Sequence, residues 1–123
     1  MHKITLSKGI KIGEKIHNIA ELRELNAGDV IAAMEESERV VMVPTPNGLE
    51  PTLLMSSALM GVNTLRRQIA SIGDINGPLE REQLNLLSDK DLDLLQSGVS
   101  AMDSALAKVI RDRGRDDATS TDD

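Results

Sequence analysis

The 123-residue sequence contains no cysteine, phenylalanine, tyrosine or tryptophan. The absence of cysteine excludes disulfide bonds, a thiolate nucleophile and zinc sites with thiolate ligands. Without aromatic side chains the chain has no platform on which bases could stack, which excludes the usual modules for single-stranded nucleic acid. The remaining composition, 40% hydrophobic and 28% charged residues, is typical of a globular protein. The core must therefore be built from aliphatic residues and methionine.

Charge and length further restrict the classes of protein to which the chain could belong. The formal net charge is −6 and the isoelectric point is near 4.9, which disfavours binding to phosphate backbones. A chain of this length suits one domain. No apolar run is long enough to cross a bilayer, and the amino terminus lacks the apolar segment of a secretion signal. We therefore expect a protein of the cytosol with no membrane partner.

The order of local patterns predicts an α+β fold, with an N-terminal β-hairpin followed by a small helical bundle. Alternation of apolar and polar residues indicates the hairpin over 3–23, with Gly9 at a bulge or bend. A second hairpin is expected around Asn47-Gly48. The predicted single domain covers residues 1–110, and a disordered polar tail covers 111–123. Within the domain we expect helices over about 27–37, 52–70, 80–87 and 89–111.

The sequence offers no catalytic constellation. The two histidines are His2, at the terminus, and His17, which we expect on the solvent side of the hairpin. The run from Asp89 to Asp93 resembles the opening of a calcium loop, but Leu94 stands where the turn needs glycine. We interpret its acidic residues as favourable at a helix start. The sequence therefore predicts a protein that is not an enzyme and has no cofactor or metal site.

The last predicted helix carries a heptad-like apolar seam, the most informative candidate for a binding site. This spacing suits packing inside the monomer or pairing with another chain, and the pattern leaves both open. The candidate partner-binding residues on it are Leu92, Leu95, Val99, Met102 and Leu106. Arg66 and Arg67 on the central helix are a secondary polar contact, with a solvated helix face as the simpler interpretation.

Several segments in this order resemble the tail assembly chaperones of Mu-like contractile-tailed phages. The resemblance begins with the hairpin segments, Ile4 to Gly13 and Ile16 to Arg23, and the helix start at residues 25–29. It continues with Leu65-Arg66-Arg67-Gln68-Ile69-Ala70-Ser71-Ile72-Gly73 and Leu87-Ser88-Asp89-Lys90-Asp91-Leu92, which are similar to the middle helix of the family and to its late leucine and acidic stretch. It covers roughly residues 3–110.

The resemblance implies a protein without catalytic residues that keeps the tape measure protein soluble while the tail tube assembles around it. It also implies a place in the cytoplasm of the infected bacterium, absence from the mature virion, a frameshifted longer form as a possible partner, and homo-oligomers. Two alternatives stay open from the residues: a small DNA-binding regulator that uses the central helix, and a minor structural component of the tail. Nucleic-acid binding is the less favoured because of the acidic charge.

Overall fold

The structure, a computed structural model, describes residues 2–121, and within the last helix it describes side chains as far as residue 113. An antiparallel four-stranded sheet has the order β1-β2-β5-β6, and β3 and β4 form a separate hairpin. These strands are β1 (His2–Ile12), β2 (Lys15–Leu22), β3 (Glu38–Thr45), β4 (Gly48–Met55), β5 (Ile69–Ile72) and β6 (Ile75–Asn76). The helices are α1 (Ala27–Glu36), α2 (Ser57–Gln68), α3 (Arg81–Leu84) and α4 (Asp89–Thr121). The α+β fold class is confirmed.

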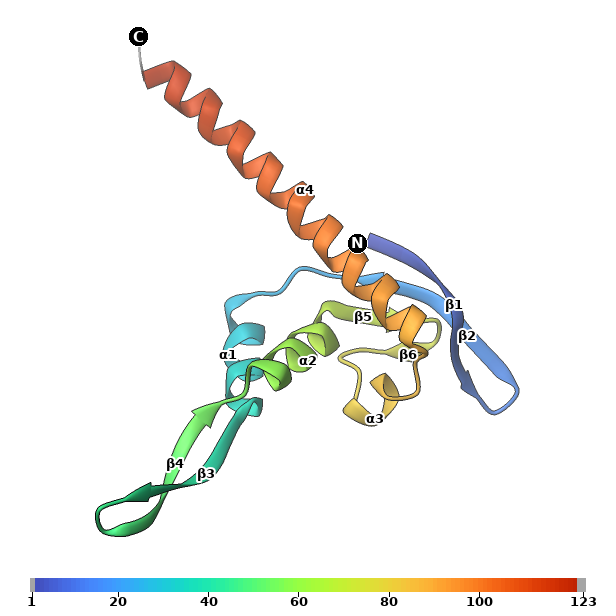
Figure 1. Cartoon of the computed structure of the whole chain (residues 1–123). Helices are drawn as coiled ribbons and strands as arrows, with labels where there is room; N and C mark the ends of the chain where they lie inside the picture. The colour runs from blue at the N-terminus through green and yellow to red at the C-terminus, as the bar shows by residue number, and fades with distance from the viewer. Residues whose placement is uncertain (1, 122–123) are drawn as a thin grey trace.

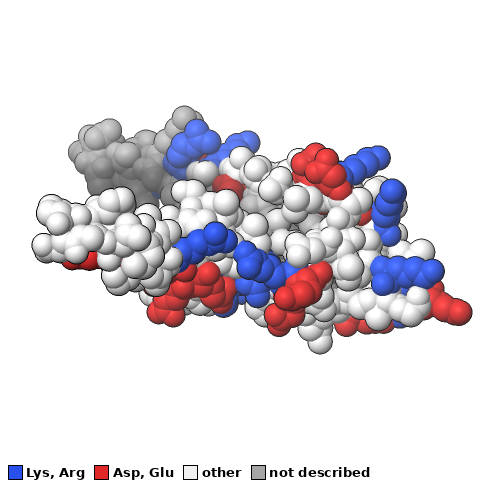
Figure 2. Space-filling model, turned by 60° about the horizontal axis from the view of Figure 1, so that its bottom comes forward, with Lys and Arg blue, Asp and Glu red and all other residues white. Residues whose placement is uncertain are grey.

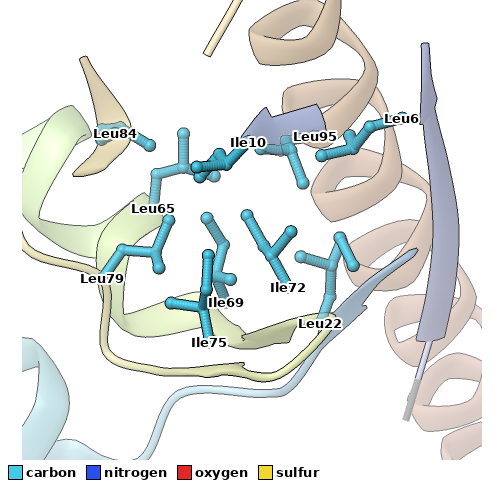
Figure 3. Close-up of a cluster of buried hydrophobic side chains, with 11 residues drawn as sticks. Leu6, Ile10, Leu22, Leu65, Ile69, Ile72, Ile75, Leu79, Leu84 and Leu95 are labelled. Atoms are coloured by element: carbon cyan, nitrogen blue, oxygen red, sulfur yellow. The ribbon is translucent and has the colours of Figure 1, made fainter. Parts of the chain in front are cut away.

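The body of the molecule is the four-stranded sheet with α2, α3 and the first half of α4 packed against it. Two parts project from the body in different directions: the β3–β4 hairpin and the second half of α4 (Figure 1). We call the β3–β4 hairpin the arm. The buried core contains only aliphatic side chains, which converge from the sheet, α2 and α4 in Figure 3. They are Leu6, Ile10, Ala20, Leu22, Leu65, Ile69, Ile72, Ile75, Leu79, Leu84 and Leu95.

The N-terminal hairpin confirms the prediction, including the irregularity at Gly9. The register between β1 and β2 shifts between Thr5 and Ile10, and Gly9 has φ +67°. A Cβ atom at Gly9 would lie 2.2 Å from the backbone oxygen of His17, so only glycine fits there. His17 itself is buried, and its Nδ1 accepts a hydrogen bond from the backbone N–H of Asp74. The prediction that His17 faces solvent is therefore wrong.

Helix α1 also begins where the sequence indicates. The side chain of Asn26 accepts a hydrogen bond from the Asp29 N–H, and the Asp29 carboxylate accepts one from the Asn26 N–H. This reciprocal capping box satisfies two backbone donors at the start of the helix. The helix buries Asp29 and Ala33, whereas its large apolar side chains Ile31 and Met34 are exposed.

The predicted helix over 52–70 is wrong at both ends. Residues up to Met55 belong to strand β4, which pairs with β3, so the second hairpin around Asn47-Gly48 is confirmed. Ser56 caps α2 through a hydrogen bond from the Leu59 N–H to its Oγ. After Gln68 the chain enters β5 and pairs with β2. Leucines and methionines before Ser56 have a spacing that also fits a helix, and pairing with the valine-rich β3 decides in favour of a strand.

Two further predicted helices differ in length. The helix expected over 80–87 is the single turn α3, Arg81–Leu84. The helix expected over 89–111 starts as predicted, but α4 continues to Thr121. The prediction of a disordered tail over 111–123 falls largely on positions whose side chains, from residue 114 on, lie outside the described residues, as do residues 122–123 altogether.

Candidate functional site

A buried carboxylate ties the start of α4 to the bulge of β1. Asp91 is completely buried and accepts hydrogen bonds from the backbone N–H groups of Ser7 (2.6 Å), Lys8 (3.0 Å) and Gly9 (2.9 Å), and from the Ser7 hydroxyl (2.9 Å). Burial by itself would raise the pKa of Asp91, but these donors lower it to about 2. We call this arrangement the Asp91 clasp. It fixes the direction in which α4 leaves the sheet.

The sequence interpretation missed the clasp because Asp91 has the spacing of an ordinary helix-start acid. Its backbone N–H does bond to the Oγ of Ser88, as a capped helix start requires. The signal that could have revealed the partner is Gly9, since a bulge exposes backbone donors that the strand ladder leaves unpaired.

The predicted seam on α4 divides into two parts. Leu95 is fully buried, and Leu92, Val99 and Met102 are partly buried against the core. Leu106 lies beyond the sheet and is 38% exposed. Most of the seam therefore packs inside this chain. Among the predicted contact residues, Leu106 stays exposed and Leu92 lines a groove described below.

Beyond Met102 the apolar spacing of α4 continues, and among the described residues His2 and Glu24 line a shallow hollow beside Leu106 and Val109 without burying them. Leu106, Val109 and Ile110 are 38%, 46% and 59% exposed, and their spacing places them on one face of the helix. We call these three residues the distal stripe. It is the part of the heptad pattern that remains available for another chain.

Arg66 and Arg67 are bound within the chain rather than presented to solvent. Arg66 donates from Nε to the backbone oxygen of Leu79 at 2.6 Å and from its guanidinium to Asn63 and Glu36 at 3.0 Å each. Arg67 forms an ion pair with Glu36, which lowers the pKa of that carboxyl. Their side chains are only 15% and 19% exposed. The interpretation as a solvated face is therefore wrong, and their predicted role as a polar contact would require breaking these bonds.

Asp29 extends the same ion-pair cluster toward the sheet. Arg23 donates to both of its carboxylate oxygens at 2.8 and 2.9 Å, and Arg67 lies 3.8 Å away. The hydrogen bonds from Arg23 and then from the Asn26 N–H lower the pKa of Asp29 to about 2. The cluster joins β2, α1 and α2 and explains how α1 is held although its apolar residues are exposed.

A groove of about 760 Å³ opens between α2, α3 and the start of α4. Its α2 wall includes three small residues, Ser57, Ala58 and Gly61, and a Cβ built on Gly61 would meet open space. Its apolar lining is Val62, Leu65, Leu84, Leu87 and Leu92. Charged and polar residues line it as well: Arg81, Glu82, Asn85, Ser88, Asp89 and Gln96. An apolar groove with polar groups around it suits the apolar face of an amphipathic helix.

The arm presents a second unpartnered surface. The register of β3 with β4 places seven apolar residues on one of its faces, and the five for which exposure is given are 44–66% exposed. We call this the apolar arm face; it consists of Val40, Met42, Pro44, Leu49, Pro51, Leu53 and Met55. Figure 2 shows the arm as a lobe at the left with almost no charged side chains.

Comparison with known proteins identifies the family of this chain. The family described as tail assembly protein gp41 matches residues 6–115, which is most of the chain. The chain belongs to this gp41 tail assembly family. The relatives that match are gp41 proteins of a Mu-like prophage and of phage Mu, so the predicted membership of the Mu-like tail assembly family is confirmed.

Relatives within the gp41 family share close to half of the aligned residues. The chain is 42% identical to the Mu-like prophage FluMu protein gp41 of Haemophilus influenzae over 92% of its own length and 87% of that relative. It is also 42% identical to the probable tail assembly protein gp41 of Escherichia phage Mu, but covers 76% of itself and only 63% of that relative. No solved structure matches the chain significantly.

The described part of the chain contains no cluster of three or more histidine, aspartate or glutamate side chains placed to hold a metal ion. None of its helices is long and apolar enough to cross a membrane. The uncovered surfaces described above are the groove, the distal stripe and the apolar arm face.

Proposed function

We propose that this protein is a tail assembly chaperone that binds the tape measure protein and keeps it soluble while the tail tube forms. The observation that carries the proposal is the open groove between α2, α3 and α4, in a member of a tail assembly family. A tape measure protein is long and helical with apolar faces, so its helices would aggregate unless covered. The groove offers such a helix an apolar floor, and the net charge of −6 would add solubility to the complex.

The proposal places the work in the cytoplasm of the infected bacterium and leaves the protein out of the finished virion. It includes a longer form of the chain as a second partner. In support, the chain also aligns at 42% identity with the phage Mu protein named FS-gp41. The alignment covers 48% of FS-gp41, whereas the alignment with the phage Mu protein gp41 covers 63% of that protein. The phage therefore has a longer relative of the same domain.

The test is co-expression with the tape measure protein of the same phage genome, measuring its soluble fraction and recovering complexes by affinity purification. Quantitation must rely on gel staining or refractive index, because the chain has no aromatic residue to absorb at 280 nm. We expect the chain to co-purify and to raise the soluble fraction several-fold. An equally soluble tape measure protein and no complex would contradict the proposal.

Gly61 provides a variant that blocks the groove with little risk to the fold. Gly61→Leu places a branched side chain in the groove, where nothing lies within 4 Å of the new Cβ, and leucine favours helix more than glycine does. Gly61→Ala is the matched control, since it changes helix propensity without filling the groove. We expect the leucine variant to lose tape measure binding and the alanine variant to keep it. Equal binding by both would place the contact elsewhere.

Two further assays test the alternative functions. A structural tail component would appear in mass spectra of purified particles. A DNA-binding regulator would show salt-dependent DNA binding that weakens with Arg66→Ala and Arg67→Ala. Because both arginines are held by Glu36 and its neighbours, we expect no such binding.

A further inference from the structure

We propose that this protein associates with copies of itself head to tail, with the distal stripe of α4 in one copy lying on the apolar arm face of the next. This inference goes beyond the proposed function, since it uses neither the groove nor the tape measure protein. It assigns a partner to the two surfaces that the body of the molecule leaves uncovered.

The arm requires a partner on physical grounds. An isolated two-stranded hairpin is marginally stable in water, and large exposed apolar patches mark interaction sites. Yet the register between β3 and β4 continues unbroken over eight residue pairs, from Glu38–Met55 to Thr45–Gly48. The root of the arm is fixed by hydrogen bonds from the Ser56 N–H and from the Asn63 side chain to Ser37. The arm is thus held away from the body as a formed surface.

The arm is suited to contacts through its face rather than its edges. Pro44 in β3 and Pro51 in β4 lack a backbone N–H, and both lie inside the continuous ladder. A proline is accommodated in a strand where the missing donor would point outward, so each outer edge of the arm has lost one donor. Addition of a further strand is disfavoured on both sides. A helix laid across the face needs no edge donors and only apolar contact.

The distal stripe has the size and charge to be that helix. On the arm face, Glu38 at the root is the one charged residue in the row that contains Val40, Met42 and Pro44. On α4, Arg113 follows Ile110 by three residues and Val109 by four, and so ends the stripe with a base on the same face. Placing Arg113 beside Glu38 pairs the acidic residue of the arm row with the basic residue that ends the distal stripe, among the side chains that the structure describes.

The distal stripe is short enough to lie wholly on the apolar arm face. From Leu106 to Arg113 the helix rises about 10 Å, at 1.5 Å per residue. From Glu38 to Pro44 the strand extends about 20 Å, at about 3.3 Å per residue. With Arg113 at the root of the arm, the stripe therefore runs toward the tip and stays on the apolar face. The pairing has one defined direction.

Within one molecule this contact cannot form. Helix α4 and the arm leave the body in diverging directions (Figure 1). The helix of one copy must therefore dock on the arm of another, and each copy has one of each surface free. Such a heterologous contact repeats from copy to copy and gives a ring or an open chain. An interface of about two helical turns on a hairpin is at the small end for stable complexes, so we expect association that depends on concentration.

The test uses two variants that each destroy one surface. Val40→Lys with Leu53→Glu charges the arm face but keeps a favourable pair across the strands, since these residues are opposite each other. Leu106→Asp with Ile110→Asp charges the exposed stripe, where no core packing is lost. Circular dichroism checks that both fold. We expect the wild-type protein to form oligomers larger than dimers by sedimentation velocity with interference optics, and each variant to be monomeric.

Mixing the two variants decides between modes of association. Each still has one intact surface, so the head-to-tail arrangement gives a one-to-one dimer and nothing larger. If the stripe variant alone associates like the wild type, the arms pair with each other and the proposal is wrong. A monomeric wild-type protein at millimolar concentration, or no dimer on mixing, would equally overturn it.

Charge reversal tests the direction of docking. We expect Glu38→Arg and Arg113→Glu each to weaken association about tenfold and the double variant to recover most of it. Lys108→Glu is the control, because Lys108 lies on the opposite side of the helix from the stripe and the same change in charge should have little effect. Failure of the double variant to recover would overturn the proposed alignment.

Discussion

The two halves of the described part of α4 have the same apolar spacing and different surroundings. From Asp89 to Met102 the apolar face packs on the sheet, with Leu95 fully buried. From Asp103 to Arg113 the same spacing continues, and Leu106, Val109 and Ile110 stay exposed to solvent within the described residues. Periodicity therefore shows which face of a helix is apolar, but not whether the chain itself or another molecule covers it.

Asp91→Ala should destabilise the protein more than any other substitution considered below, because it removes the acceptor that holds the first half of α4 to β1. Three backbone N–H groups and one hydroxyl would lose their partner, and a buried donor without an acceptor costs about 1–3 kcal/mol. We expect the free energy of unfolding to fall by about 3–5 kcal/mol, measured by urea denaturation followed by circular dichroism. Asp93→Ala, at an exposed position two residues on, should change it by less than about 0.5 kcal/mol. Similar losses in the two variants would show that the clasp does not anchor the helix.

Leucine truncation compares the two halves directly. Leu95→Ala should lower the free energy of unfolding by about 3 kcal/mol, because it leaves a cavity in the core. Leu106→Ala removes the same atoms from an exposed position, so the monomer should lose less than about 1 kcal/mol. Denaturation at low protein concentration measures both. Equal losses would mean that the distal half is packed within the monomer in solution.

Acid should weaken the body. Asp91 and Asp29 have pKa values of about 2 in the folded chain, below the ordinary value of 3.8. Their contribution to stability is complete above about pH 5 and is lost as the pH falls toward 2, since the unfolded state then binds more protons than the folded state. For Asp91 alone this is roughly 2 kcal/mol. Urea denaturation at pH 6, 4 and 3 measures this loss of stability. If the free energy of unfolding of the Asp91→Asn variant did not change with pH, the whole effect would come from the Asp91 clasp.

Replacing the glycine in the groove wall should change the free energy of unfolding least. Gly61→Ala should raise the free energy of unfolding by about 0.5–1 kcal/mol through helix propensity, as its Cβ meets open space. Gly98→Ala, on the packed half of α4, should destabilise instead, because its Cβ would lie 1.8 Å from Cδ1 of Ile4. Thermal denaturation of the two variants distinguishes them. A loss at Gly61 would mean that the groove closes in solution.

Local signals account for what the sequence predicted correctly. The turn at Gly13, the bulge at Gly9 and the cap at Asn26 each depend on residues that are neighbours in the chain. The β2–β5 pairing was missed because Ile69 continues the apolar spacing of α2 and its strand partner, Leu22, is distant in sequence. The Asp91 clasp and the ion pairs of Arg66 and Arg67 were missed for the same reason.

The candidate site shows the same division. The seam was predictable from spacing, but the sequence could not show that α4 leaves the sheet after Met102, which depends on the length of β1 and on where Asp91 anchors the helix. The apolar arm face was hidden because its residues were divided between a predicted strand and a predicted helix. Only the register of β3 with β4 places Val40 opposite Leu53.

The Asp91 clasp also sets the order of events during synthesis on the ribosome. Strands β1 and β2 emerge first and can pair at once, but the donors of Ser7, Lys8 and Gly9 have no acceptor until Asp91 leaves the exit tunnel, 82 to 84 residues later. Until then the nascent chain exposes one face of a finished hairpin. The sheet is sealed only after residue 91 has emerged, so a ribosome that stalls before that codon would release an open and aggregation-prone fragment.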